Sequence, residues 1–189
     1  MNRPTRTSSA SPAQTSILAS LVLTVLAAGT ACAAMLAPGA PMPEFALADQ
    51  NGAIVRSQDL VGQSYLLWYY PKAMTPGCTK EAQGLRDRFA EFKTAGVEVL
   101  GVSFDKPDAN RRFVEAEALP FRLLSDADRK LAIAVGAADS DSAWVAKRIS
   151  YLVGPDGKIR KAYDNVDPSN HAATVLKDSS AATHAPPKP

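Results

Sequence analysis

Hydrophobic and polar positions follow one another along the chain in blocks that predict strands and helices in turn. An apolar and aromatic run at residues 65–70 ends at Pro71, a pattern typical of a strand buried on both faces. Apolar residues then recur at spacings of three and four over residues 82–92, which predicts a helix that ends at Gly96. Residues 97–102 are again mostly apolar and predict the next buried strand.

The rest of the pattern predicts shorter elements separated by turn signals at Asn51-Gly52 and at Gly154-Pro155-Asp156-Gly157. The expected elements are strands at 44–47 and 121–124, helices at 108–118 and 127–135, a hairpin of strands at 148–153 and 158–163, and a last helix at 169–176. Strands that alternate with helices and end in a hairpin predict one α/β domain, whose mostly parallel central sheet carries an antiparallel portion.

The first 33 residues have the pattern of an export leader. Arg3 and Arg6 form a positive start without acidic residues, the apolar run at 17–28 is too short for a membrane span, and Ala31-Cys32-Ala33 matches a cleavage site. We therefore expect a signal peptide over 1–33, a folded domain over 34–178 and a disordered tail over 179–189, which is rich in Ala, Ser and Pro.

Two alternatives to cleavage after Ala33 stay open. The leader could remain as a membrane anchor, or it could be a lipoprotein leader, because Gly29-Thr30-Ala31-Cys32 faintly resembles a lipobox with Cys32 as the lipidated residue. Each alternative is compatible with export, so we expect the protein in the periplasm or cell envelope.

Composition excludes several classes of protein. An apolar fraction of 46% and a charged fraction of 21% are ordinary for a globular domain. Arg3 and Arg6 account for two of the 21 basic residues, so the remainder carries as many basic as acidic side chains, 19 of each, and a nucleic-acid partner is not expected. Two cysteines and two histidines are too few for a disulfide scaffold or a structural zinc site, and we expect neither a metal nor a cofactor.

The candidate chemistry lies where the strand at 65–70 gives way to the following helix. Cys78 falls in the first turn of that helix, at the edge of the sheet where ligands bind in α/β folds. Unpaired backbone N–H groups and the helix dipole favour a thiolate at such a position, and the thiolate is the nucleophilic form of cysteine. A lone buried cysteine is otherwise an inert apolar residue, so the surrounding motif decides between the two interpretations.

The segment from Tyr70 to Thr79 resembles the peroxiredoxins, and above all their bacterioferritin-comigratory, or Q-type, subfamily. The family motif P-x-x-x-[TS]-x-x-C is met by Pro71, Thr75 and Cys78. The similarity runs from about residue 41 to residue 176 and includes the segments Leu123-Leu124-Ser125-Asp126 and Ser169-Asn170-His171. It implies a thioredoxin-like fold, with a central mixed sheet flanked by helices, and a thiol-dependent peroxidase.

The resemblance also implies roles for individual residues. Cys78 would be oxidised by the peroxide to a sulfenic acid, Thr75 would place its hydroxyl beside the sulfur, and Pro71 would shield the sulfur from water. Arg148 would hold a positive charge beside the thiolate, and Glu81, one helical turn after Cys78, would orient Arg148.

Each of these supporting residues also has a purely structural interpretation. Thr75 could be a cap or turn residue, Arg148 a surface residue with Lys147 in its place, and Glu81 a partner of the helix dipole. Tyr70 is expected in the core, at the border of the site, and His171 is interpreted as a structural or surface histidine.

Gln83 marks a departure from the subfamily. Many members carry a resolving cysteine at this position, five residues after the peroxidatic one. Its absence predicts a one-cysteine enzyme whose sulfenic acid is resolved by an external thiol, either a thioredoxin-like protein or a small thiol. We expect a monomer or weak homodimer.

Two other functions differ from the peroxidase in the residues or the turnover that they require. A thioredoxin-type thiol–disulfide oxidoreductase needs a C-x-x-C motif, and Cys78 is followed three residues on by Glu81. A non-enzymatic peroxide sensor or thioredoxin-fold binding module would share Cys78 but would not turn over.

Overall fold

The computed structural model describes residue 1, residues 34–164 and residues 166–183 of the 189-residue chain. Apart from Met1, the expected leader, its cleavage site and Cys32 lie outside the described residues, as do residues 184–189 of the expected tail. Among the helices of the described part, none combines the length and apolar character that a membrane span requires.

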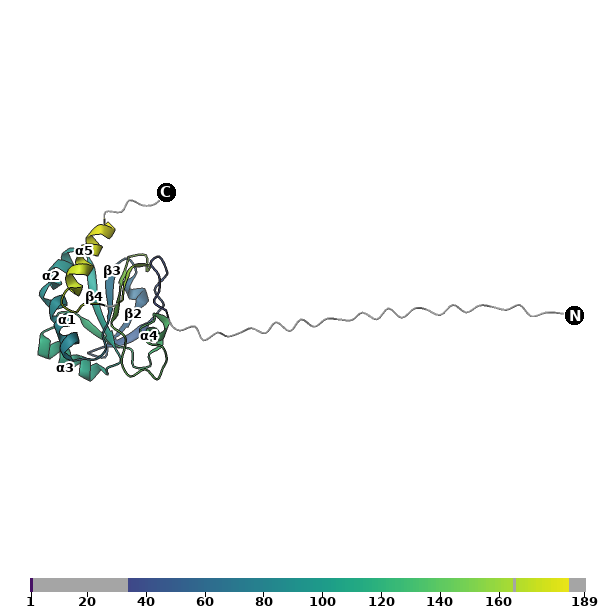
Figure 1. Cartoon of the computed structure of the whole chain (residues 1–189), viewed down its shortest axis with the longest axis horizontal. Helices are drawn as coiled ribbons and strands as arrows, with labels where there is room; N and C mark the ends of the chain where they lie inside the picture. The colour runs from purple at the N-terminus through teal and green to yellow at the C-terminus, as the bar shows by residue number, and fades with distance from the viewer. Residues whose placement is uncertain (2–33, 165, 184–189) are drawn as a thin grey trace. The chain divides into compact units, whose positions relative to one another are not determined.

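A seven-stranded mixed sheet forms the centre of the domain, in the order β2-β1-β5-β4-β3-β6-β7 (Figure 1). The strands are β1 (Ala46–Asp49), β2 (Ile54–Arg56), β3 (Ser64–Tyr69), β4 (Val97–Ser103), β5 (Arg122–Ser125), β6 (Ile149–Val153) and β7 (Ile159–Tyr163). β3, β4 and β5 run parallel, while every other neighbouring pair is antiparallel. The predicted mixed sheet is confirmed, but the expectation that it is mostly parallel is wrong, because four of its six strand pairs are antiparallel. β2 and the 3₁₀ turn η1 (Ser57–Leu60) were not expected, because three-residue and four-residue elements carry too little periodicity to be recognised.

Five helices accompany the sheet. They are α1 (Pro76–Asp87), α2 (Phe89–Thr94), α3 (Pro107–Glu117), α4 (Lys130–Ala134) and α5 (His171–Thr183). The single helix expected up to Gly96 is in fact two helices, because the backbone leaves helical geometry at Arg88, which has φ −107° and ψ 14°.

Two predicted helix boundaries are wrong. The helix expected over 127–135 shrinks to α4, because Asp126 and Arg129 shape a turn before it: the carboxylate of Asp126 accepts from the Ala132 N–H at 2.7 Å, and Arg129 has a positive φ of 61°. α5 continues past the expected domain end at residue 178. The hydroxyls of Ser179 and Ser180 both donate to the Leu176 carbonyl, so they are engaged within the helix itself.

The two faces of the sheet bury separate apolar clusters. α1, α2, α3 and α5 cover one face, and α4 with the chain before β1 covers the other (Figure 1). Successive residues of β3, and Tyr70 directly after it, alternate between the clusters. Tyr65, Leu67 and Tyr69 pack on the α4 side, and Leu66, Trp68 and Tyr70 pack on the α1 side. This double burial explains the uninterrupted apolar run in the sequence.

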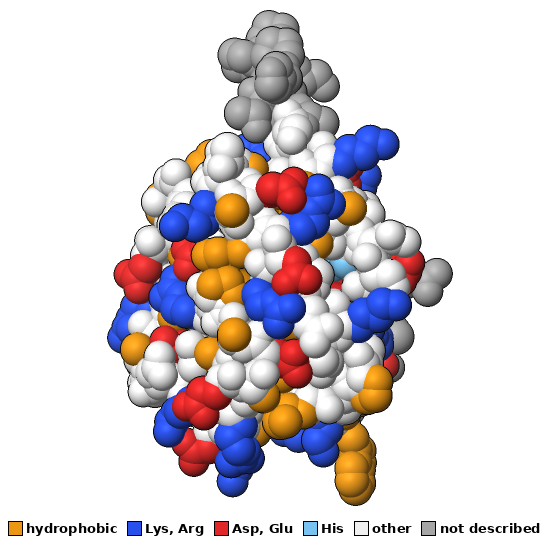
Figure 2. Space-filling model, turned by 90° about the vertical axis from the view of Figure 1, so that its left-hand side faces the viewer, with side chains coloured by type: hydrophobic (Ala, Val, Ile, Leu, Met, Phe, Trp, Pro, Cys, Tyr) orange, Lys and Arg blue, Asp and Glu red, His pale blue; other side chains and the backbone are white. Residues whose placement is uncertain are grey.

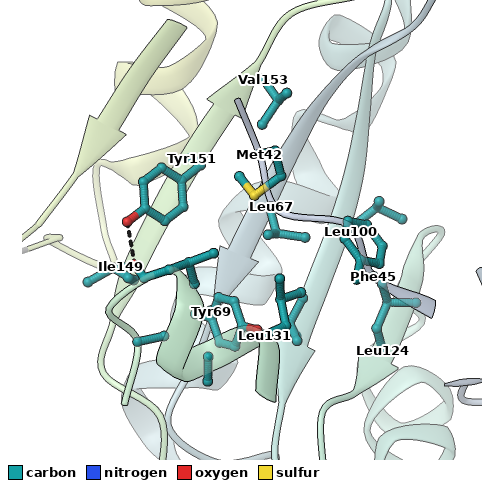
Figure 3. Packing of buried hydrophobic residues seen from close by; sticks show 14 of the residues in the cluster. Met42, Phe45, Leu67, Tyr69, Leu100, Leu124, Leu131, Ile149, Tyr151 and Val153 are labelled. Atoms are coloured by element: carbon teal, nitrogen blue, oxygen red, sulfur yellow. Dashed lines mark hydrogen bonds between the residues drawn. The ribbon is translucent and has the colours of Figure 1, made fainter. Parts of the chain in front are cut away.

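Polar ends of aromatic side chains are satisfied within the α4-side cluster. The Tyr151 hydroxyl donates to the Val135 carbonyl at 2.5 Å, among the side chains of Met42, Phe45 and their neighbours (Figure 3). The Tyr69 hydroxyl donates to the carboxylate of Asp126 at 3.0 Å. Burial raises the pKa of Asp126 and raises that of Tyr69 well above its usual value, because an apolar surrounding disfavours the charged form of each group.

Basic and acidic side chains are interspersed on the face that Figure 2 shows, which is the face covered by α1, α2, α3 and α5. Several of them form exposed pairs, such as Arg88 with Glu91 at 2.8 Å. Pairs of this kind contribute little to stability but keep the field over the surface weak.

Candidate active site

Cys78 lies in the first turn of α1, and its side chain is fully buried. α1 begins at Pro76, whose fixed φ suits a first helical position, and Thr75 is the N-cap residue with an extended backbone. The sulfur packs in the α1-side cluster, with Trp68 and Tyr70 among its members. The sulfur is therefore shielded from solvent, and a small reactant or a movement of the loop is needed to reach it.

The loop between β3 and α1 is fixed by Asp105, which follows the end of β4. The Asp105 carboxylate accepts from the Ala73 N–H at 2.8 Å and from the Ser103 hydroxyl at 3.0 Å. Met74, next in the loop, has a positive φ of 62°, which is uncommon for a residue other than glycine. Sequence reasoning missed Ser103 and Asp105. Their position at the carboxyl end of a parallel strand was the signal that could have found them.

Arg148 contacts the sulfur directly. It precedes β6, and its Nη2 donates to Cys78 Sγ at 3.3 Å while its Nη1 pairs with Glu81 Oε2. Desolvation lowers the pKa of Arg148, but the hydrogen bond to Cys78 and the charge of Glu81 outweigh it, so that the pKa is raised overall. The neighbouring Lys147 instead pairs with Asp139 at 2.6 Å, so Arg148 and not Lys147 is the cation at the sulfur.

Glu81 is buried between two basic side chains. One oxygen pairs with Arg148, and the other lies 2.7 Å from Nδ1 of His171, the first residue of α5. Both the Glu81 and the His171 side chains are almost completely buried, with exposed fractions of 0% and 2%. His171 is therefore not a surface residue, and Cys78, Arg148, Glu81 and His171 form one connected group.

The other predicted residues surround this group at different depths. The Thr75 hydroxyl donates to the Lys72 carbonyl at 2.9 Å and caps no helical N–H group. Pro71 is half-buried at the exit from β3. Tyr70 is fully buried and donates to Asn110 Oδ1 at 2.8 Å, and burial raises its pKa. Tyr70 thus belongs to the core beneath the site.

The side chain of Gln83, on α1, bonds to α3 and not to the sulfur of Cys78. Its side-chain amide donates to Glu117 Oε2 at 2.8 Å, and Arg86 donates to the Glu117 carbonyl at 2.8 Å. These bonds tie α1 to the end of α3. Within the described part of the chain, Cys78 is the one cysteine, and it is unpaired.

This arrangement suits nucleophilic chemistry by a thiolate. The helix start and the guanidinium of Arg148 both favour negative charge at the sulfur and on any oxygen that leaves from it. The described residues contain no group of His, Cys, Asp and Glu side chains suited to hold a metal ion.

Comparisons with known proteins show the family and the fold of the chain. Residues 38–162 match the model of the AhpC/TSA family. Peroxiredoxin Bcp of Escherichia coli is 47% identical over 140 residues, which cover 71% of this chain and 89% of the relative. The crystal structure of peroxidoxin BcpB from Mycobacterium tuberculosis has a TM-score of 0.72 at 30% identity and covers 76% of this chain and 96% of its own. A mutant PrxQ from Xylella fastidiosa has a TM-score of 0.74 at 25% identity, covering 80% and 99% of the two chains. The expected thioredoxin-like fold is therefore confirmed.

Gly77 makes the close approach of Arg148 testable. A Cβ at Gly77 would lie 3.2 Å from Arg148 Nη2, so Gly77→Ala should push the guanidinium a few tenths of an ångström away from the sulfur. We expect the rate constant for oxidation of Cys78 by hydrogen peroxide to fall roughly three- to tenfold, because misplacing a catalytic group by about 1 Å costs roughly a hundredfold. Stopped-flow kinetics measures this rate.

Gly84→Ala is the matched control, since it adds the same methyl group to the same helix. At Gly84 the nearest atom to a new Cβ is 3.9 Å away, an ordinary contact. Equal rates for the two variants would contradict the proposed dependence on the position of Arg148.

Proposed function

The chain belongs to the AhpC/TSA family as a Bcp/Q-type peroxiredoxin, a thiol-dependent peroxidase, and from this premise we propose that Cys78 reduces peroxides by a one-cysteine mechanism. The proposed substrates are hydrogen peroxide and small organic hydroperoxides. The observation that carries the proposal is the contact of Arg148 Nη2 with Cys78 Sγ at 3.3 Å, in the first turn of α1.

In the proposed reaction, the Cys78 thiolate attacks the terminal oxygen of the peroxide. A sulfur–oxygen bond forms as the oxygen–oxygen bond breaks, so the sulfur is oxidised to a sulfenic acid and the peroxide is reduced to an alcohol or water. The departing oxygen carries negative charge and takes a proton from solvent. Arg148 is placed to stabilise the charge as it moves from sulfur to oxygen.

Thr75 is proposed to orient the peroxide. Because its hydroxyl proton is donated to the Lys72 carbonyl, its oxygen is left to accept a hydrogen bond from the protonated peroxide oxygen. Pro71 is proposed to limit the approach of water to the sulfur. Both roles agree with the places of these residues at the two ends of the loop that leads into α1.

Resolution is proposed to come from an external thiol. The thiolate of a thioredoxin-like protein or a small thiol attacks the sulfenic sulfur, a mixed disulfide forms, and hydroxide leaves as water. A second thiol then releases Cys78. Gln83, with its amide engaged by Glu117, supports this proposal, because the position used by many Q-type enzymes for a resolving cysteine carries no sulfur.

We expect Cys78→Ser to abolish peroxide consumption and to leave the fold intact, because the substitution removes the nucleophile and changes one buried atom. Multiple-turnover consumption of hydrogen peroxide with dithiothreitol or thioredoxin as donor measures the activity. Circular dichroism and the unfolding midpoint check the fold.

Cys32→Ser is the matched control and should keep full activity. Substantial turnover by Cys78→Ser would overturn the assignment of the nucleophile. A single turnover in wild type that no donor renews would favour the peroxide sensor over the enzyme.

One equivalent of peroxide should convert the protein that lacks residues 1–33 to a sulfenic acid without an internal disulfide. The expected mass change is a gain of about 16 Da, or a thiol adduct when a donor is present, and excess peroxide should add a further oxygen. Intact-mass spectrometry distinguishes these products. A loss of about 2 Da within the full-length monomer, abolished by Cys32→Ser, would show that Cys32 resolves Cys78 and that the one-cysteine proposal is wrong.

Export to the periplasm or cell envelope is proposed from the leader pattern alone. The family model begins at residue 38, so the leader lies outside the part shared with the family. Full-length protein expressed in a Gram-negative bacterium should lose roughly 3 kDa and fractionate with the periplasm or envelope. Palmitate labelling that depends on Cys32 would identify the lipoprotein form, and unprocessed protein confined to the cytosol would contradict export.

A further inference from the structure

His171 is buried at the back of the active site, and the proposed reaction does not use it. Its Nδ1 lies 2.7 Å from Glu81 Oε1, an ion-pair contact without hydrogen-bond geometry, and among the described residues no hydrogen-bond partner is found for Nε2. A buried ring nitrogen without a partner is costly for a residue with a purely structural role. The contact with Glu81 instead connects His171, through one carboxylate, to the guanidinium that touches the sulfur.

The charges of the connected group do not balance unless His171 is counted. With a thiolate at Cys78, a carboxylate at Glu81 and a guanidinium at Arg148, the three groups carry a net charge of about −1 in a buried place. Burying net charge is unfavourable. A proton on His171 makes the group neutral, and this proton therefore favours the thiolate and frees Arg148 from part of the attraction of Glu81.

The surroundings of His171 permit this change of charge. His171 lines a cavity of about 170 Å³ together with Tyr163, Asp164, Val166, Asp167, Asn170 and Thr174. Two of these lining residues are acidic, and both follow β7.

The remaining charged and titratable groups near His171 come from three elements. Glu81 faces it from α1, and the ring of Tyr163 on β7 contacts the imidazole edge-on with ring centres 5.7 Å apart. The Tyr163 hydroxyl donates to Asp178 on α5 at 3.0 Å, and burial, followed by the negative charge of Asp178, raises the pKa of Tyr163. The pKa of Asp167 is lowered chiefly by the hydrogen bond from the Ser169 N–H, and the positive charge of Lys80 on α1 lowers it further.

We propose that His171 is a positioning residue that acts through Glu81, and that its protonation promotes the reaction of Cys78 with peroxide. This inference rests on the proposed function of Cys78. When His171 carries a proton, Glu81 is shared between two cations and Arg148 donates more strongly to the sulfur and to the departing oxygen. When His171 is neutral, Glu81 competes with the sulfur for Arg148.

The test compares the pH dependence of wild type with that of His171→Asn. The amide nitrogen of asparagine takes the approximate place of Nδ1, so an N–H group beside Glu81 is kept while the titrating charge is lost. Stopped flow measures the rate constant for oxidation of Cys78 by hydrogen peroxide. At pH about 5.5 we expect this rate constant to be about fivefold higher in wild type than in His171→Asn, and at pH about 8 we expect the two proteins to be nearly equal. The two pH values lie on either side of about 6.5, where free histidine titrates.

His184→Asn is the matched control, because His184 is the second of the two histidines and lies outside the described residues. It should follow wild type at every pH. A ratio of wild type to His171→Asn that stays constant across the pH range would overturn the proposal, because a merely structural role predicts a uniform loss. If peroxide fails to oxidise Cys78 in wild type itself, the proposed function is overturned instead.

The role of Glu81 as the connection is tested in a double-mutant cycle. In a Glu81→Gln background, His171→Asn should no longer change the pH profile, because the carboxylate that couples the two cations is absent. A pH-dependent effect of His171→Asn that persists without Glu81 would show that His171 does not act through it.

A second measurement avoids any folding defect of the histidine variant. The imidazole signals of His171 are followed by NMR titration in reduced wild type and in Cys78→Ser. Because coupling is reciprocal, removing the thiolate should lower the pH at which His171 loses its proton. Identical titration midpoints in the two proteins would overturn the proposal.

Discussion

The shared guanidinium of Arg148 is the interaction on which the site depends. Arginine offers several donors in one rigid plane, so it can bind Cys78 Sγ with one nitrogen and Glu81 with another. Glu81 is fully buried, and a carboxylate there without a basic partner would cost several kcal/mol. The same arginine thus stabilises the reactive sulfur and makes the burial of Glu81 tolerable. Gly77, without a Cβ, leaves the space through which the guanidinium approaches.

The register of the sheet brings this arginine to the sulfur from a distant part of the sequence. β6 pairs antiparallel with β3, and Ile149 lies opposite Tyr69 at the end of that pairing. Arg148, immediately before β6, therefore emerges beside the exit of β3, where the chain turns toward α1. A slip of one residue in this pairing would send the side chains to the opposite faces of the sheet. The apolar clusters on both faces oppose such a slip, because β3 buries large side chains on each.

Sequence patterns predicted what depends on burial and on a local motif. The runs at 65–70 and 97–102 were recognised because both faces of β3 and β4 are covered, and the segment from Tyr70 to Thr79 placed Cys78 at a helix start. Contacts between distant residues were harder to foresee. The bond from Ala73 to Asp105 joins two loops, and the burial of His171 against Glu81 depends on how α5 packs on α1. The local sequence of a single helix or loop does not predict which distant residue it will contact. The break at Arg88 was missed for a related reason, since the apolar spacing continues through it into α2.

Thr75 shows that the helix start is arranged for chemistry at some expense of stability. Threonine at an N-cap position ordinarily accepts a hydrogen bond from a helical N–H, an interaction that contributes about 1 kcal/mol. Here the Thr75 hydroxyl turns back to the Lys72 carbonyl and forms no cap. The first N–H groups of α1 are thereby not taken by the cap side chain, and their partial positive charge acts on the sulfur of Cys78 instead. The unused cap, the left-handed backbone of Met74 and the buried charge of Glu81 beside the half-buried Arg148 all lie within this one site. Each of these features reduces the stability of the fold, and they lie together where a thiolate must be both buried and reactive. The large apolar clusters on the two faces of the sheet supply the stability that offsets them.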